Sequence, residues 1–326
     1  MRVNVKEGNM PNANHRCAVL GKPIAHSLSP VLHNAAYHAL GLEDWFYDKH
    51  EVGECDLEDF LKSLDSGWAG LSLTMPLKRT IQPYGEPSNI WAKELNVANT
   101  AIFDWTRSHQ VGDADLPYIK LYNTDVPGIQ MAFEHAYRMR NQNAPANHAG
   151  NAVIIGNGNT ATSALAACTA MAGISHITVV ARHPDKNAEL EPLARKFLSG
   201  EHPIDIVTMD DAMDALSEAR VVINTIPGLA ADGIATALAA SGLEVNGTLL
   251  DVVYDPRPTK LMQAWRRQGQ GGYAIGGEEM LLYQAMIQVL LMTGMWDGDP
   301  PTNATVDIKQ DERLEHAMRM ALEEAL

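Results

Sequence analysis

One segment, residues 151–186, limits the possible folds of this chain more than any other. It begins with an apolar run (152–155) and passes through a glycine turn (156–158). A run of small apolar residues (161–172) follows, and a β-branched run (177–180) closes the segment. This succession predicts a strand, a tight turn, a helix and a second strand, which together make a βαβ unit. The segment therefore predicts an α/β fold.

The glycine turn has the pattern G-x-G-x-x-A, formed by Gly156, Gly158 and Ala161. In dinucleotide-binding proteins the first glycine permits the tight turn, and the second lets a pyrophosphate approach the backbone. The phosphates then meet free N–H groups at the helix N-terminus. An ordinary strand-to-helix turn can carry the same letters, but here both flanks match the required context, which favours dinucleotide binding. The expected contacts are Gly156, Asn157, Gly158, Asn159, Thr160 and Ala161.

The end of the second strand indicates which dinucleotide binds. Units that bind NAD have a carboxylate there for the ribose 2′-OH. This chain instead has Ala181, Arg182 and His183, with Lys186 close behind. Cationic side chains suit a 2′-phosphate, so the sequence predicts NADP as the cofactor. The alternative is a solvated arginine at a strand end.

Composition restricts the range of functions. The chain has 326 residues, of which 46% are hydrophobic and 20% charged, values that suit two globular domains. Its net charge of −15 leads us to expect a small-molecule substrate and no nucleic-acid or membrane partner. Cys17 and Cys168 are expected to be buried thiols, and no Cys/His cluster has zinc-ligand spacing, so we expect no metal. Because we find no signal peptide or bilayer-length apolar run, we expect a cytoplasmic protein. We expect it to be a monomer or a homodimer.

Two serines near the N-terminus form a candidate anion site. A helix is predicted from about residue 29 to residue 40, with Ser29 as its N-cap and Pro30 in its first turn. Ser27 and Ser29 then lie at a helix N-terminus, which attracts a carboxylate. Capping alone would explain Ser29 but not the pair.

Two further candidates stand where strands are predicted to end. Lys78 follows an apolar strand, 70–74, that Pro76 closes, and Asp125 follows a strand that ends near Asn123. Sheets of α/β proteins bind ligands at such strand ends. A lone lysine at such a position is usually solvated surface.

The second half of the chain alternates strands and helices. Six strands with intervening helices predict a doubly wound parallel sheet of order 3-2-1-4-5-6. The apolar helix that follows, 278–293, should be buried between domains. We expect a substrate-binding catalytic domain, residues 1–126 and 278–326, and an NADP-binding Rossmann domain, residues 127–277. A deep cleft should separate them.

Other segments carry weaker signals. Residues 98–103 and 118–123 predict a hairpin with a polar excursion, 104–117, between its strands. Residues 140–150 are expected to be a connector, and 297–308 a loop before a final amphipathic helix.

Taken together and in order, these motifs resemble the shikimate dehydrogenases. The resemblance extends from residue 17 to about residue 294, and eight motifs in register make it specific. They are GKPIAHSLSPVLHN (21–34), GLSLTMPLK (70–78), ANT (98–100), YNTD (122–125), GNGNTATSA (156–164), INTIP (223–227), DVVYDP (251–256) and GGEEMLLYQA (276–285). The resemblance implies an NADP-dependent oxidoreductase that reduces 3-dehydroshikimate to shikimate in aromatic amino acid biosynthesis.

The resemblance also assigns roles to residues. Lys78 and Asp125 match the family's catalytic pair, and Ser27 and Ser29 would bind the substrate carboxylate. Other substrate contacts would come from Thr74, Asn99, Asp125, Tyr254 and Gln284. Further cofactor contacts would come from Thr225, Pro227, Val253 and Gly277.

The chain departs from the family pattern in places. Ser72 stands where the family usually has Asn, and the excursion 104–117 and the tail past residue 296 look like additions. A quinate/shikimate dehydrogenase that prefers NAD is one alternative, although such enzymes often have an acidic residue where Arg182 stands. A noncatalytic dinucleotide-sensing homologue is another, and it would predict loss of Lys78 or Asp125.

Overall fold

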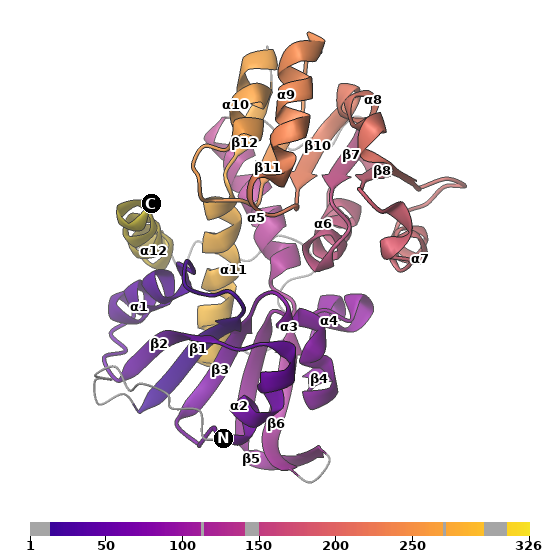
Figure 1. The fold of residues 1–326 in the computed structure, drawn as a ribbon. Helices are drawn as coiled ribbons and strands as arrows, with labels where there is room; N and C mark the ends of the chain where they lie inside the picture. Colours follow the sequence, from indigo (N-terminus) through magenta and orange to yellow (C-terminus); the bar gives the residue numbers. More distant parts are fainter. Residues whose placement is uncertain (1–13, 112–113, 141–149, 270–271, 297–311) are drawn as a thin grey trace.

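Two six-stranded sheets dominate the computed structural model, which describes residues 14–111, 114–140, 150–269, 272–296 and 312–326. Figure 1 shows one sheet below the other, with long helices running between them. None of the helices in these described ranges combines the length and the apolar character that a bilayer span requires.

The first sheet is mixed and has the strand order β2-β1-β3-β5-β6-β4. Strand β1 pairs in parallel with β2 and β3, whereas β5 pairs antiparallel with both β3 and β6. The strands are β1 (His15–Gly21), β2 (Trp45–Glu51), β3 (Trp68–Leu73), β4 (Glu86–Pro87), β5 (Thr100–Val111) and β6 (Ala114–Tyr122). The helices that accompany them are α1 (Ser29–Ala39), α2 (Leu57–Lys62), α3 (Leu77–Thr80) and α4 (Ile90–Leu95).

The second sheet is parallel throughout and has the order β12-β11-β10-β7-β8-β9. If β7 is counted as the first strand of this sheet and the sheet is read from the β9 edge, the order is 3-2-1-4-5-6. The predicted strand order is therefore confirmed. The strands are β7 (Gly150–Ile155), β8 (Ile174–Val180), β9 (Ile204–Val207), β10 (Ala219–Asn224), β11 (Thr248–Asp251) and β12 (Tyr273–Ile275). The helices are α6 (Asn159–Ala170), α7 (Leu190–Phe197), α8 (Ala212–Ser217), α9 (Asp232–Ser241) and α10 (Lys260–Gln268).

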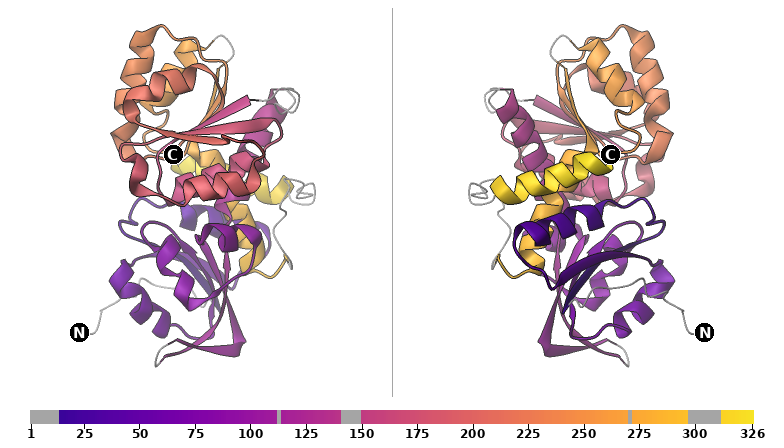
Figure 2. Two further views of the ribbon diagram at one scale, coloured as in Figure 1. Left: turned by 90° about the vertical axis from the view of Figure 1, so that its right-hand side faces the viewer. Right: turned by 90° about the vertical axis from the view of Figure 1, so that its left-hand side faces the viewer.

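Three more helices connect the halves: α5 (Asp125–Met139), α11 (Gly277–Met292) and α12 (Glu312–Ala325). As its largely apolar sequence predicts, α11 is buried on nearly every side, and it packs against α5, α1 and strands β3 and β5. Helix α12 lies against α1 and α11 with Leu314, Met318 and Leu322 buried. Figure 2 shows it as a yellow helix beside the indigo α1.

Several sequence predictions need correction. The excursion 104–117 is not a loop, because β5 continues to Val111 and β6 begins at Ala114, so the hairpin extends well beyond the predicted strands. Residues 104–117 lack the regular alternation of apolar and polar residues that would have predicted strands there. Ser29 is the first helical residue of α1 rather than its cap, since Leu28 holds the N-cap position without a side-chain hydrogen bond. Helix α4 was not predicted. Of the predicted connector 140–150, Gly150 already belongs to β7, and residues 141–149 lie outside the described residues, as does the predicted loop 297–308.

One close helix contact sets the geometry beneath the cavity described below. Gly128 lies in α5 directly against α11, where an added Cβ would fall 2.8 Å from Gln284 Cβ and 3.0 Å from its backbone nitrogen. Both distances are shorter than van der Waals contact, so only glycine fits without moving α11.

We predict that Gly128→Ala lowers the free energy of unfolding by about 1–3 kcal/mol, because overpacking forces the two helices apart. The same change at the exposed Gly233 of α9, where an added Cβ meets nothing within 4 Å, should raise stability by up to about 1 kcal/mol. Urea denaturation of both variants measures the difference. Equal effects at the two positions would contradict this packing account.

Candidate active site

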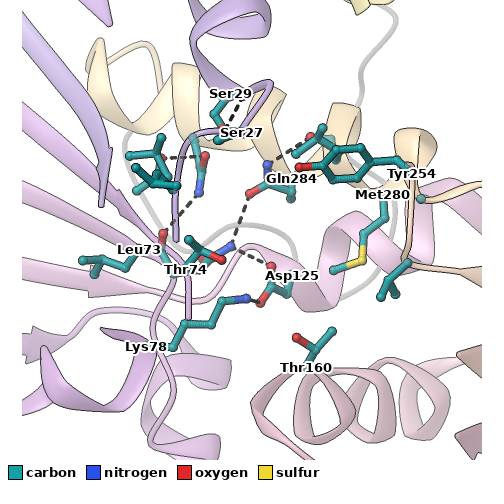
Figure 3. Close-up of a pocket in the computed structure, with 18 of the residues that line it drawn as sticks. Ser27, Ser29, Leu73, Thr74, Lys78, Asp125, Thr160, Tyr254, Met280 and Gln284 are labelled. Atoms are coloured by element: carbon teal, nitrogen blue, oxygen red, sulfur yellow. Dashed lines mark hydrogen bonds and ion pairs between the residues drawn. The ribbon is translucent and has the colours of Figure 1, made fainter. Parts of the chain in front are cut away.

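A cavity of about 330 Å³ lies between the two sheets. The carboxyl ends of β1 and β3 lead into it from the first sheet, and those of β7, β11 and β12 lead into it from the second. This is where α/β sheets bind ligands. Figure 3 shows side chains from both halves converging on it. Ten predicted site residues line it: Ser27, Ser29, Thr74, Lys78, Asn99, Asp125, Thr160, Tyr254, Gly277 and Gln284.

A buried ion pair lies in this cavity. Lys78 Nζ is 2.5 Å from Asp125 Oδ2, and the two residues are only 8% and 3% exposed. The alternative of a solvated surface lysine is therefore wrong. Lys78 comes from α3, just after Pro76 ends the strand segment, and its backbone carbonyl accepts a hydrogen bond from Ala98 N. Burial strengthens the attraction between the two charges and holds the ammonium at one point of the wall.

Two asparagines hold Asp125 in place, one through its carboxylate and one through its backbone. Asn99 Nδ2 donates to Asp125 Oδ1 at 2.9 Å, and its Oδ1 accepts from Thr124 N at 2.8 Å. Asn123 Oδ1 accepts from the backbone nitrogens of Asp125 and Val126, which satisfies donors at the start of α5. The Asp125 carboxylate is thus held by Lys78 on one oxygen and Asn99 on the other.

The two serines lie at the other end of the cavity, at the start of α1. Ser29 N donates to Ser27 Oγ at 3.4 Å, and the first turn of α1 contains no acidic residue. Figure 3 shows both side chains on the side opposite Lys78. A helix N-terminus that lacks acids and presents two hydroxyls suits a carboxylate.

Ser72 belongs to a polar wall of the cavity. Tyr47 OH donates to Ser72 Oγ at 2.6 Å, and Ser72 Oγ in turn donates to Gln288 Oε1 at 2.8 Å. Gln288 Nε2 donates to Thr100 Oγ1 at 3.0 Å. Since the single Ser72 proton is already used, Ser72 can only accept a hydrogen bond from a ligand. The wall therefore favours a ligand hydroxyl over a ligand carbonyl.

Tyr254 closes the side nearest the second sheet. It follows β11, and burial raises the pKa of its phenol, so it stays a hydrogen-bond donor at neutral pH. The turn that carries it is anchored by Asp251, which accepts from Asn224 Nδ2 at 2.8 Å and from Thr259 Oγ1 at 2.6 Å. These contacts tie the ends of β10 and β11 together.

The glycine turn after β7 has the geometry that a dinucleotide requires. Gly156 has φ +111°, and a Cβ there would lie 2.5 Å from Thr225 Oγ1. Beside Gly158 an added Cβ would meet nothing within 4 Å, so the backbone is open to a ligand. Helix α6 has no side-chain cap and no acidic residue in its first turn, which leaves its N–H groups for an anion.

The remaining predicted cofactor residues do not line the cavity. They lie at the carboxyl ends of the strands of the second sheet, along the edge that faces the cavity. Arg182, His183 and Lys186 follow β8 and are exposed, as a 2′-phosphate site requires. Asn157 Nδ2 donates to His183 O at 2.7 Å, which joins this group to the glycine turn. Thr225 and Pro227 follow β10, and Val253 follows β11. Gly156, Asn157 and Gly158 form the turn, and Asn159 and Ala161 lie in the first turn of α6. These residues fit NADP.

Sequence reasoning missed several residues of this site. Asn123 was noted only as a strand end, and Tyr47, Gln288 and Arg79 were not singled out. Only Gln288 carried a usable signal, since it is a polar residue four positions after Gln284 in an apolar helix and so faces the same way.

A parallel sheet with a glycine turn, facing a polar cavity that holds a buried lysine and carboxylate, defines an oxidoreductase of the Rossmann type. Comparison with known proteins identifies the family. The sequence profile of the shikimate dehydrogenase substrate binding domain matches residues 19–101. The shikimate dehydrogenase (NADP(+)) of Methanothrix thermoacetophila is 33% identical over 307 residues, which cover 94% of this chain and 97% of that protein.

Solved structures agree. The crystal structure of Mycobacterium tuberculosis shikimate dehydrogenase has a TM-score of 0.73 and 33% identity, and the match covers 95% of this chain and 99% of that one. Shikimate 5-dehydrogenase from Thermus thermophilus, in complex with NADP(H) and shikimate, has a TM-score of 0.65 and 25% identity over 94% of this chain and 99% of that one. This chain belongs to the shikimate dehydrogenase family.

We predict strong energetic coupling between Lys78 and Asp125. Either Lys78→Met or Asp125→Asn leaves a buried charge without its partner and should lower the free energy of unfolding by about 3–5 kcal/mol. The double variant should recover at least about 1 kcal/mol of the summed loss. The exposed pair Arg195–Glu191 is the control, because its coupling energy should stay below about 0.5 kcal/mol. Denaturation of both variant sets measures the two couplings, and equal values would contradict the buried-pair account.

Proposed function

We propose that this protein catalyses the reversible NADPH-dependent reduction of 3-dehydroshikimate to shikimate. The observation that carries the proposal is the cavity itself. It has a helix start with two serine hydroxyls at one end, a lysine–aspartate pair at the other, and the glycine turn of the second sheet beside them. Relatives that are named for this activity, and a structure with NADP(H) and shikimate bound, support it.

The substrate residues divide into two groups by position. Ser27 and Ser29 would hold the carboxylate, so that the ring extends toward Lys78. Thr74, Asn99, Tyr254 and Gln284 surround the middle of the cavity and would bind ring hydroxyls, with Asp125 beside them. The acceptor wall at Ser72 would receive a hydrogen bond from one of these hydroxyls in place of the usual family Asn.

The proton would come from Lys78. NADPH, when bound, supplies the hydride to the ketone carbon. The Lys78 ammonium can then protonate the developing alkoxide, and in the reverse direction the amine accepts that proton. Asp125 would position the Lys78 ammonium beside the substrate ketone. The carboxylate can do this because Asn99 holds its other oxygen in place.

Arg182, with His183 and Lys186, would bind the 2′-phosphate and select NADP. The turn residues 156–161 would hold the pyrophosphate, while Thr225, Pro227, Val253 and Gly277 would line the nicotinamide side. This division of roles matches the proposed domains, in which residues 1–126 and 278–326 bind substrate and residues 127–277 bind NADP.

We predict that the purified enzyme oxidises shikimate with NADP⁺ at a kcat/KM at least about tenfold above that with NAD⁺, because NAD⁺ lacks the 2′-phosphate and one lost charged contact is worth about that much. We also predict that it prefers shikimate to quinate. Initial rates with the four substrate and cofactor combinations measure this. A preference for quinate with NAD⁺ would favour the quinate/shikimate alternative, and no turnover of any pair would favour the noncatalytic one.

We predict that Arg182→Ala weakens NADP⁺ binding by roughly 10- to 100-fold and leaves NAD⁺ binding nearly unchanged, because only NADP⁺ has the 2′-phosphate. Titration of the intact enzyme with each dinucleotide measures both dissociation constants. Equal losses for the two dinucleotides would rule out a 2′-phosphate contact at Arg182.

A further inference from the structure

An arginine of the first half of the chain reaches into the dinucleotide turn of the second half. Arg79 directly follows Lys78 in α3. Its Nε donates to Asn159 Oδ1 at 3.0 Å, and its Nη2 lies 2.6 Å from Glu189 Oε2. The family resemblance assigned no role to Arg79.

The place that Arg79 reaches is the open start of α6. Asn159 is the first residue of that helix, and Gly158 before it has open space where a side chain would be. With neither a capping side chain nor an acidic residue in its first turn, this helix start is where the pyrophosphate is proposed to bind. A guanidinium hydrogen-bonded to Asn159 therefore lies beside that anion.

The present partners of Arg79 are weak competitors for an anion. The Glu189 side chain is 57% exposed, and exposed ion pairs contribute little. Asn159 is neutral. A guanidinium has five N–H donors, and its contacts to described residues use two of them, so it can bind a phosphate oxygen without losing Asn159. An arginine–phosphate contact is charge-assisted and often bidentate, so it is stronger than the exposed contact with Glu189.

We propose that Arg79 is a cofactor-binding residue that contacts the dinucleotide pyrophosphate. On cofactor binding, its guanidinium leaves Glu189 and binds a pyrophosphate oxygen instead. The inference rests on the proposed function, because it requires a dinucleotide at α6. Since Arg79 and Lys78 are adjacent in α3, cofactor binding also fixes the helix that presents the proton donor. Because NAD and NADP share the pyrophosphate, this contact does not discriminate between them, whereas a contact of Arg182 with the 2′-phosphate would.

Titration of the intact enzyme with NADP⁺ and with NAD⁺, without substrate, tests this directly. Arg79→Gln keeps a hydrogen bond to Asn159 possible but removes the charge, and it should raise both dissociation constants by the same factor, roughly 10- to 100-fold. Arg79→Lys should lie between. Arg267→Ala removes an exposed arginine of α10 and should change neither constant, which controls for net charge.

Glu189→Gln separates phosphate binding from a simple tie between the two halves of the chain. If Arg79 binds pyrophosphate, this variant releases the guanidinium and should leave both dissociation constants unchanged or lower. If Glu189→Gln weakens binding as much as Arg79→Gln does, the ion pair is only a structural tie and the inference is wrong. Unchanged binding in Arg79→Gln, with Arg182→Ala still selective against NADP⁺, would overturn the inference and leave the proposed function standing. Failure of the wild-type enzyme to bind either dinucleotide would overturn both.

Discussion

A lysine and an aspartate buried together, Lys78 and Asp125, impose the main constraint on this structure. Removing two charges from water is costly, and only close pairing with further hydrogen bonds compensates for it. The chain provides those bonds through Asn99, whose amide holds the second carboxylate oxygen, and through Asn123, which fixes the start of α5. The pair can form only if α3 and α5 meet at the carboxyl edge of the first sheet.

The same edge determines where the cofactor can bind. Helices α5 and α11 run between the sheets, and their close contact at Gly128 holds Gln284 against the cavity. The second sheet presents its own carboxyl ends to the same space, so Thr160, Tyr254 and Gly277 line the cavity from that side. The proposed substrate and dinucleotide sites thus share one opening, because strand ends of the two sheets face the same cavity. Arg79 extends this relation, since it crosses from the substrate side to the start of α6.

Much of this arrangement could be predicted from local sequence. Alternating apolar runs and turn residues predicted the second sheet and its strand order, and Gly156 indicated a backbone that only glycine adopts easily. Strand-end positions predicted that Lys78 and Asp125 face a ligand. Their direct contact, however, depends on the packing of two segments 47 residues apart, which no local pattern describes.

Other features could not be predicted for physical reasons. Strand β5 continues through polar residues because backbone pairing in an extended hairpin needs no buried face. The Tyr47–Ser72–Gln288 wall depends on hydrogen bonds between residues far apart in sequence, so Ser72 alone looked like a lost contact rather than part of a network. No local pattern marks Arg79, because its partners Asn159 and Glu189 lie in the second half of the chain.

In the proposed function, Lys78 moves the proton while other residues hold the ring. Lys78→Met keeps the length and apolar stem of the side chain, so the most direct measurement is its kcat for shikimate oxidation together with its dissociation constant for shikimate. Lys93→Met, an exposed change in α4, is the control. We predict that kcat falls by about 10²–10⁴ in Lys78→Met, while shikimate affinity changes by less than about threefold. A Lys78→Met enzyme with near-native kcat would show that another group handles the proton and would contradict this account.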